Sequence, residues 1–275
     1  MSTTWHDSAP PPVRIGALGW LRVAARGLPM AVLVFGGLLV LLAVRLVERP
    51  LCGLARPVTP HITRLVCRGA LAILGLRLRV EGRVMEGRGA VVANHASWLD
   101  IFALNASDTV YFIAKSEVAD WPGIGWLARA TGTVFIRRDP RQAAAQRDLL
   151  RDRLLAEHRL LFFPEGTSTD GLRVLPFKST LFGAFFDHHM SIGLQLQAVT
   201  LVYTAPPGAD LRFYGWWGDM DFGAHLLKCL AAPRHGAVRV IYHPAVRVAD
   251  FTSRKALAEH LGETVRSSLN QSLTT

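Results

Sequence analysis

A long apolar run dominates the first part of the chain. Residues 27–44 (GLPMAVLVFGGLLVLLAV) carry no charged side chain over 18 positions, which is near the shortest helix that crosses a hydrocarbon core about 30 Å thick. Arginines flank the run on both sides, so the positive-inside rule assigns no orientation. Residues 1–13 are polar and proline-rich and lack the basic start of a secretory signal, so they are predicted to form a flexible tail.

A second apolar segment, residues 61–76, has helical spacing. Its arginines, Arg64 and Arg68, lie four positions apart on one side of the predicted helix. This pattern is typical of a helix lying in the membrane interface with its arginines among lipid phosphates. We therefore expect residues 14–76 to form membrane-associated hydrophobic helices. The alternative is a pair of buried core helices, because 18 apolar residues is a marginal length for a membrane span.

Beyond residue 76, short apolar runs alternate with helical stretches, a pattern that predicts an α/β domain over residues 77–275 with a mixed sheet flanked by helices. Helices are expected over residues 142–158 and 253–269, the second with Ser253 as a possible N-cap. Seven strands are expected from their β-branched and aromatic residues: residues 76–80, 90–93, 110–114, 133–136, 160–163, 196–203 and 238–242.

Composition narrows the class of partner. Hydrophobic residues make up 50% of the 275 and charged residues 19%, which excludes intrinsic disorder. The 31 Lys and Arg residues outweigh 21 Asp and Glu and give a net charge of +10, which suits a phosphate-bearing partner. The apolar N-terminus favours membrane lipid over nucleic acid. The three cysteines are far apart, without a CxxC motif, so we predict neither a disulfide framework nor a metal site.

The stretch NHASWLD, residues 94–100, follows a predicted strand and places His95 and Asp100 five positions apart. An aspartate that accepts a hydrogen bond from one imidazole nitrogen leaves the other free to take a proton from a hydroxyl group. The pair therefore predicts a general base. The pattern alone is weak, because about half a match is expected by chance among ten histidines.

Two cations also follow predicted strands. The stretch GTVFIRR ends with the arginine pair Arg137 and Arg138. The planar guanidinium of Arg137 suits a phosphate held through two hydrogen bonds, with Arg138 as a possible helper. Lys115 ends another predicted strand and would add positive charge. The alternative for these residues is a solvated arginine pair and an exposed lysine.

The stretch FPEGTST, residues 163–169, gathers unusual residues in one turn. Glu165, Gly166 and Thr167 supply a carboxylate, a glycine that permits close backbone approach, and a hydroxyl. A purely structural turn does not need all three. Lys178, further along the same loop, is a candidate for added positive charge, although an exposed lysine is the more common explanation.

The motifs NHxxxxD, GxxFIxR and FPEGTS, in this order, resemble those of the glycerolipid acyltransferase family, which contains 1-acylglycerol-3-phosphate acyltransferases. The two N-terminal segments look like the membrane-docking helices of its bacterial members. The resemblance implies that His95 is the base and Asp100 its orienting partner. It also implies that Arg137 belongs to the acceptor phosphate site and that Glu165 and Gly166 belong to the wall of the acceptor site. A fourth family motif is matched too loosely for a role to be assigned.

The reaction that the resemblance implies moves a fatty acyl group from a thioester, acyl-CoA or acyl carrier protein, to the free hydroxyl of 1-acyl-sn-glycerol-3-phosphate. No other cofactor is expected. The developing oxyanion would be stabilised by amides of the 165–167 turn or by a nearby lysine or arginine. The sequence contains no GxSxG elbow and no cysteine near His95, so direct attack by the acceptor is simpler than a covalent relay.

Three alternatives stay open. Residues 165–171, 176–179 and 214–220 look like those of bacterial members that include lyso-ornithine lipid acyltransferases, which gives a second acceptor. A membrane-bound esterase would use water in place of the alcohol, and a non-catalytic basic lipid-binding protein would need no base.

The expected location is the inner membrane, with the active site on the cytoplasmic side.

Overall fold

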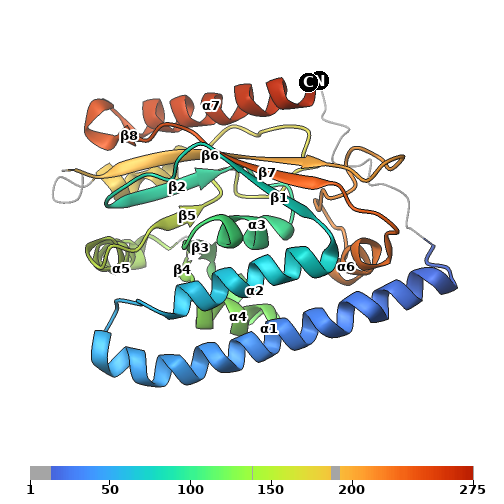
Figure 1. The fold of residues 1–275 in the computed structure, drawn as a ribbon. Coiled ribbons are helices and arrows are strands. Elements are labelled where there is room, and N and C mark those ends of the chain that lie inside the picture. Colours follow the sequence, from blue (N-terminus) through green and yellow to red (C-terminus); the bar gives the residue numbers. More distant parts are fainter. Residues whose placement is uncertain (1–13, 138, 187–192, 275) are drawn as a thin grey trace.

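The computed structural model describes residues 14–137, 139–186 and 193–274, so the predicted tail over residues 1–13 lies outside it. In this part of the chain eight strands form one mixed sheet with the order β1-β7-β6-β2-β5-β3-β4, and β8 pairs with β6 (Figure 1). The strands are β1 Arg77–Glu81, β2 Gly89–Ala93, β3 Tyr111–Lys115, β4 Val134–Ile136, β5 Leu160–Phe162, β6 Gln195–Thr204, β7 Ala237–Tyr242 and β8 Val246–Arg247.

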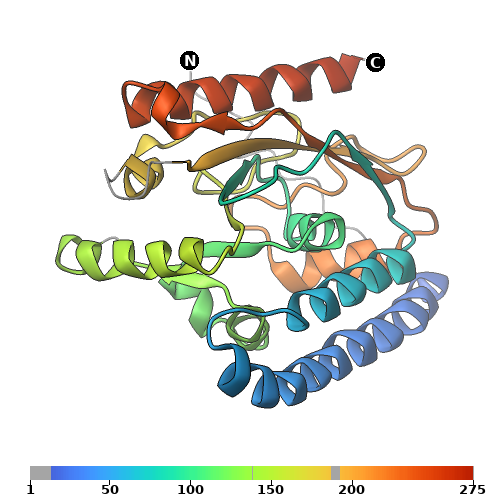
Figure 2. The same cartoon turned by 60° about the vertical axis from the view of Figure 1, so that its left-hand side comes forward.

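Helices cover both faces of the sheet. Helix α7 lies over one face, whereas α3, α2 and α1 follow one another on the opposite side, with α1 outermost (Figures 1 and 2). Two apolar cores result, one on each face of the sheet. The helices are α1 Ala17–Cys52, α2 Thr59–Leu74, α3 Leu99–Ser107, α4 Ile124–Thr131, α5 Ala143–Leu155, α6 Phe222–Ala231 and α7 Arg254–Thr274, and 3₁₀ turns span Ser116–Asp120, Pro140–Gln142, Ser179–Phe186 and Val248–Asp250.

The mixed α/β class predicted from the sequence is confirmed, and the seven expected strands lie within about one residue of β1 to β7. Strand β8 has two residues, too few for a hydrophobic pattern. The predicted N-cap of the last helix is also observed, since the Ser253 hydroxyl accepts a hydrogen bond from the Ala256 N–H at 3.2 Å.

Four neighbouring strands position the site. Strand β2 pairs in parallel with β5, β5 with β3, and β3 with β4. The carboxyl ends of these strands therefore meet at one edge of the sheet, where ligands of α/β proteins usually bind. The segments that follow β2, β5 and β4, and the last residue of β3, are those that carry the motifs found in the sequence.

Helix α1 is longer than the predicted apolar run and has 36 residues, a length of about 54 Å. It is the one helix of the described residues that is long and apolar enough to cross a membrane, and only 6% of its most apolar window is buried. It nevertheless contacts the rest of the protein along its length. A Cβ at Gly19 would lie 3.6 Å from Ala231 of α6, and one at Gly37 would lie 2.4 Å from Val66 of α2.

Helix α2 departs from the predicted interface helix. Leu71 and Leu74 are buried in the core shared with α3 and the sheet. Arg64 and Arg68 donate hydrogen bonds to the carbonyl oxygens of Ala106, and Arg64 also to that of Ser107, at the end of α3. These bonds occupy part of each guanidinium, because cationic side chains satisfy the unpaired carbonyls at a helix C-terminus. The expected contact of these arginines with lipid phosphates stays a prediction.

Candidate active site

The turn between β2 and α3 holds the predicted base and its partner. His95 Nδ1 lies 2.7 Å from Asp100 Oδ2, and Asp100 is fully buried. The same oxygen accepts the N–H groups of Ala96 and Ser97 at 2.8 and 3.0 Å. Asp100 also lies in the first turn of α3, where a helix favours negative charge. The carboxylate is thus held as an anion facing the imidazole.

Tyr203, at the end of β6, holds the other oxygen of this carboxylate. Its hydroxyl donates to Asp100 Oδ1 at 2.7 Å. Burial, together with the charge of Asp100, raises the pKa of Tyr203 well above 10, so the phenol keeps its proton. With Asp100 acting only as an acceptor, His95 Nδ1 carries the hydrogen, and Nε2 is the nitrogen with a free lone pair. The His95 side chain is 20% exposed, which leaves it accessible.

An aromatic side chain fixes the plane of the imidazole. The His95 ring stacks on Phe163 with centroids 4.0 Å apart and an angle of 10° between the planes. Phe163 follows β5 directly and stacks in turn on Phe112 of β3, with centroids 6.0 Å apart. Phe163, which follows the strand next to β2, therefore fixes the plane of the same imidazole ring that Asp100 orients.

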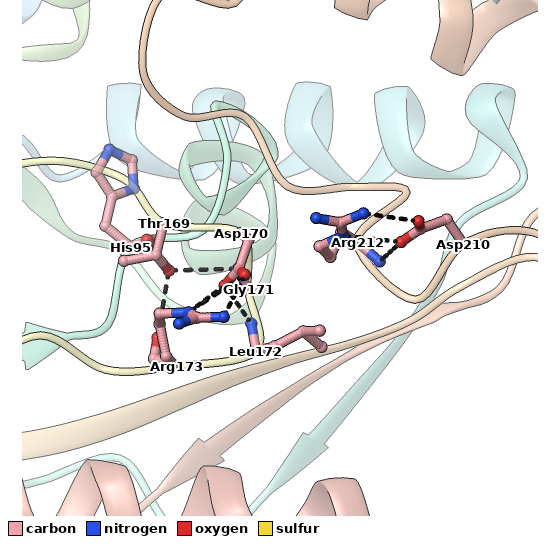
Figure 3. A network of polar contacts seen from close by, with 8 residues as sticks. All are labelled: His95, Thr169, Asp170, Gly171, Leu172, Arg173, Asp210 and Arg212. Atoms are coloured by element: carbon pink, nitrogen blue, oxygen red, sulfur yellow. Dashed lines mark hydrogen bonds and ion pairs between the residues drawn. The ribbon is translucent and has the colours of Figure 1, made fainter. Parts of the chain in front are cut away.

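The loop that follows β5 forms hydrogen bonds with both the N–H and the carbonyl of His95. Glu165 is 1% exposed and accepts the His95 N–H through Oε1 at 2.7 Å. Its Oε2 accepts the Leu175 N–H at 2.6 Å. The carbonyl of His95 accepts the N–H of Thr169 at 2.8 Å, and Figure 3 shows these two residues side by side. Glu165 therefore connects the backbone of His95 to Leu175, further along the same loop.

Burial raises the pKa of Glu165 to about 8, against the lowering effect of the two N–H donors. The folded protein then holds a proton that the unfolded chain loses above about pH 4.3, so the free energy of unfolding should fall as the pH rises from about 4.3 to about 8. Glu165→Gln should weaken this pH dependence. It should also destabilise the protein by about 1–3 kcal/mol, because an amide offers one acceptor oxygen to two N–H groups.

Thermal unfolding of detergent-solubilised protein at pH 5, 7 and 9 tests this effect. Glu259→Gln, at an exposed position on α7, is the matched control and should follow the wild type. An unchanged pH dependence in Glu165→Gln would contradict the assignment.

Lys178 lies over the turn that contains Gly166. Gly166 has φ +74°, and a Cβ there would lie 2.8 Å from Lys178 Nζ. The Lys178 N–H donates to the Pro164 carbonyl at 2.9 Å, which brings the lysine back to the start of the loop. Thr167 is exposed beside this turn. The structure therefore gathers the four residues of this loop that the sequence singled out, with a cation among them.

Arg137 and Lys115 lie at the same edge of the sheet as His95 but further along it. Lys115 pairs with Ile136, so Arg137 follows the neighbouring strand, and both cations are exposed. The pKa of Glu117 is lowered by its own backbone N–H and, to a lesser extent, by the charges of both cations. Strand β4 is the third neighbour of β2, a separation of about 14 Å between strands. Arg138 lies outside the described residues.

An ion pair between Asp170 and Arg173 shapes the rest of the loop. Asp170 is 1% exposed and accepts hydrogen bonds from the guanidinium of Arg173 and from the Leu172 N–H (Figure 3). A second pair, Asp210 and Arg212, lies nearby in the same view. The sequence analysis gave no role to Asp170, nor to Tyr203, Phe163 and Thr169, which contact the base directly or through Asp100. Phe163 and Thr169 lie in the FPEGTST stretch that the sequence singled out, whereas a single sequence offers no signal for the contact of Tyr203 with Asp100.

Two of the three cysteines, Cys67 and Cys229, are buried in the described part of the chain. Burial raises the pKa values of Cys67 and Cys229 to about 12, so neither thiol forms a thiolate near neutral pH. In the part of the chain that the structure describes, no three His, Cys, Asp or Glu side chains are grouped so that they could hold a metal ion.

Comparison with known proteins places this site in a family. The Acyltransferase family model matches residues 77–203, which contain all three motifs. The chain is 59% identical to the lyso-ornithine lipid O-acyltransferase of Rhodobacter capsulatus over 97% of each chain. It is 32% identical to the 1-acyl-sn-glycerol-3-phosphate acyltransferase of Neisseria meningitidis, covering 72% of this chain and 77% of the relative.

The fold has a solved counterpart. It resembles the crystal structure of the 1-acyl-sn-glycerophosphate acyltransferase of Thermotoga maritima with a TM-score of 0.62 and 19% identity, covering 92% of this chain and 96% of that one. The expected family is thereby confirmed, and the chain belongs to the glycerolipid acyltransferases.

Proposed function

We propose that the protein is a lyso-ornithine lipid O-acyltransferase. The observation that carries this proposal is the 59% identity to the Rhodobacter capsulatus enzyme over nearly the whole of both chains. It favours the acceptor that the sequence analysis held as the alternative. The second candidate acceptor is 1-acyl-sn-glycerol-3-phosphate, which the relative from Neisseria meningitidis supports at lower identity and coverage.

In the proposed reaction His95 Nε2 removes the proton of the acceptor hydroxyl as the oxygen attacks the thioester carbonyl. The C–O bond forms, the C–S bond breaks, and the proton returns to the leaving thiolate. Asp100 stabilises the imidazolium that exists between these steps. Lys178, above the Gly166 turn, is the cation best placed in this loop to stabilise the oxyanion. The acyl donor is acyl-CoA or acyl carrier protein, and the mechanism requires no further cofactor.

Removing the Tyr203 hydroxyl should test how its hydrogen bond to Asp100 supports the base. Tyr203→Phe should lower kcat about tenfold and leave the acceptor KM nearly unchanged, because Tyr203 touches Asp100 and not the substrate. The acid limb of the kcat/KM profile should move to higher pH, since Asp100 with one donor fewer holds the His95 proton more strongly. Tyr242→Phe, which removes a buried hydroxyl bonded to Ser107, is the control and should keep the wild-type profile. An identical profile in both variants would refute the role of Tyr203.

The arginine pair at the end of the second motif, Arg137 with Arg138, is proposed to hold the anionic group of the acceptor, which is the carboxylate of ornithine or the phosphate of 1-acyl-sn-glycerol-3-phosphate. Arg137→Ala should raise the acceptor KM about ten- to a hundredfold, because a charge-assisted two-point contact is lost. Arg137→Lys should recover part of this affinity. The exposed Arg247, on β8, gives the control Arg247→Ala. A KM unaffected by Arg137→Ala would remove this residue from the acceptor site.

The acceptor itself is tested with purified protein, acyl-CoA or acyl carrier protein, and both lysolipids, with product identification by mass. We expect rapid acylation of lyso-ornithine lipid. Rapid acylation of 1-acyl-sn-glycerol-3-phosphate alone would replace the first candidate with the second. Thioester hydrolysis that does not depend on any lysolipid would favour the esterase alternative.

We further propose that α1 lies in the interface of the inner membrane, with the site on the cytoplasmic side. Its outward face is apolar, with Leu39 68% and Val32 74% exposed. A helix that contacts its own domain from Gly19 to Glu48 cannot cross the bilayer while that domain stays on one side. This arrangement fits an apolar helix that lies along the membrane surface better than a span.

A further inference from the structure

A cavity with charged side chains in its wall lies at the opposite edge of the sheet from His95. It has a volume of about 310 Å³ and lies between the loop that joins α1 to α2 and the starts of β3 and β5. Arg56 and His61 come from the helical segments, and Tyr111, His158 and Arg159 come from the sheet. Because strands run from this edge to the catalytic edge, the two sites are separated by the length of the strands.

His158 keeps a donor nitrogen without an acceptor in this cavity wall. The residue is 4% exposed, and burial, with the charges of Arg153 and Arg56, lowers its pKa to about 4. The ring is therefore neutral at pH 7. Nδ1 accepts a hydrogen bond from Arg153 at 3.1 Å, so Nε2 carries the hydrogen. The Leu54 backbone also hydrogen-bonds to the ring and raises its pKa, but no partner meets Nε2 with full hydrogen-bond geometry.

Two arginines of the wall also have a buried nitrogen without an acceptor. Arg56 Nη1 donates to the Ala130 carbonyl at 2.9 Å and the guanidinium lies over the Tyr111 ring, but Arg56 Nε is buried without an acceptor. Arg159 pairs with Asp108, and its Nε is likewise buried without an acceptor. Buried donors are nearly always paired in folded proteins, so such a group of unpaired donors points to a missing acceptor.

The charge of the wall identifies the acceptor as an anion. Among the described residues no carboxylate forms an ion pair with Arg56, whose guanidinium contacts a carbonyl and an aromatic ring. Glu157 lies on the wall but is exposed, and Asp108 is already taken by Arg159. Two guanidinium groups and a neutral imidazole N–H match the oxygens of a phosphate group.

We propose that this cavity binds a phosphate group, that of an anionic phospholipid headgroup, at a site separate from the acceptor site. The cavity opens beside Cys52 at the end of α1 and Pro60 at the start of α2, which is the side of the protein that carries the exposed apolar helix. Its volume is at the lower end for ligand pockets and suits a headgroup. The proposal does not depend on which lysolipid the enzyme acylates.

The test measures equilibrium binding of short-chain phosphatidylglycerol, short-chain phosphatidylcholine and inorganic phosphate to the full-length protein in neutral detergent. Arg56→Gln should weaken binding of phosphatidylglycerol at least about tenfold, because a charge-assisted contact is lost. Arg68→Gln removes the same charge from α2 away from the cavity and should bind within about twofold of the wild type. His158→Phe keeps the ring stacked on Tyr111 and removes the Nε2 donor, so it provides a second variant if Arg56→Gln unfolds.

The arms of the experiment separate the sources of the phosphate. Competition between phosphatidylglycerol and inorganic phosphate would support one shared phosphate site. Binding of inorganic phosphate without phosphatidylglycerol would overturn the lipid as the source. Equal binding by the wild type, Arg56→Gln and His158→Phe would overturn the site itself.

Discussion

His95→Ala is expected to lower the rate of acyl transfer about a hundred- to ten-thousand-fold, because it removes the group that takes the proton from the acceptor hydroxyl. The fold should persist, since the His95 backbone, and not its side chain, holds the contacts with Glu165 and Thr169. Single-turnover kinetics with purified protein, together with thermal unfolding, measure both effects.

The control for this prediction is His260→Ala, at an exposed position on α7. It should retain wild-type turnover. Asp100→Asn should be nearly as harmful as His95→Ala, because an amide can favour the wrong imidazole tautomer. Turnover near the wild-type rate in His95→Ala would show that this histidine is not the base.

The second large effect is structural. Leu74→Ala should lower the free energy of unfolding by about 2–5 kcal/mol, because Leu74 of α2 is 1% exposed in the core shared with α3 and the sheet. Leu65→Ala, on the exposed side of the same helix, removes the same atoms from a position that is 68% exposed. It should change the stability by less than about 0.5 kcal/mol.

Thermal unfolding of both variants in neutral detergent distinguishes a core helix from a detachable membrane helix. A large loss in Leu74→Ala beside a stable Leu65→Ala fits the packing of α2 described above. Equal effects of the two changes would mean that α2 is not an integral part of the domain core.

The sequence was sufficient for the elements of the sheet and for the local part of the site. Seven strands could be predicted because each is a short apolar run between turn signals, and His95 with Asp100 could be predicted because a single turn joins them. The motif order also suggested the family. What the pattern does not contain is which strands are neighbours, and so the approach of Tyr203 to Asp100 across 103 positions could not be predicted.

The N-terminal helices illustrate a different limit. Apolar residues bury equally well in lipid and in a protein core, so the hydropathy of residues 61–76 did not distinguish an interface helix from a core helix. Whether such a helix packs into the core depends on partners distant in sequence, such as the α3 carbonyls that accept hydrogen bonds from Arg64 and Arg68. For the acceptor, the motifs fit two lysolipids equally, and only likeness over the whole chain favours one.

The pairing of β1 with β7 has a consequence for biosynthesis. Arg77 pairs with Ala237, so about 160 further residues must be translated before the partner of the edge strand β1 exists. At about 5–20 residues per second, translation needs roughly 8–32 s to supply that partner. Helix α1 leaves the ribosome long before then, with its apolar face ready for the membrane contact proposed above. Under that proposal, the nascent chain would reach the bilayer before the sheet of the catalytic domain can close.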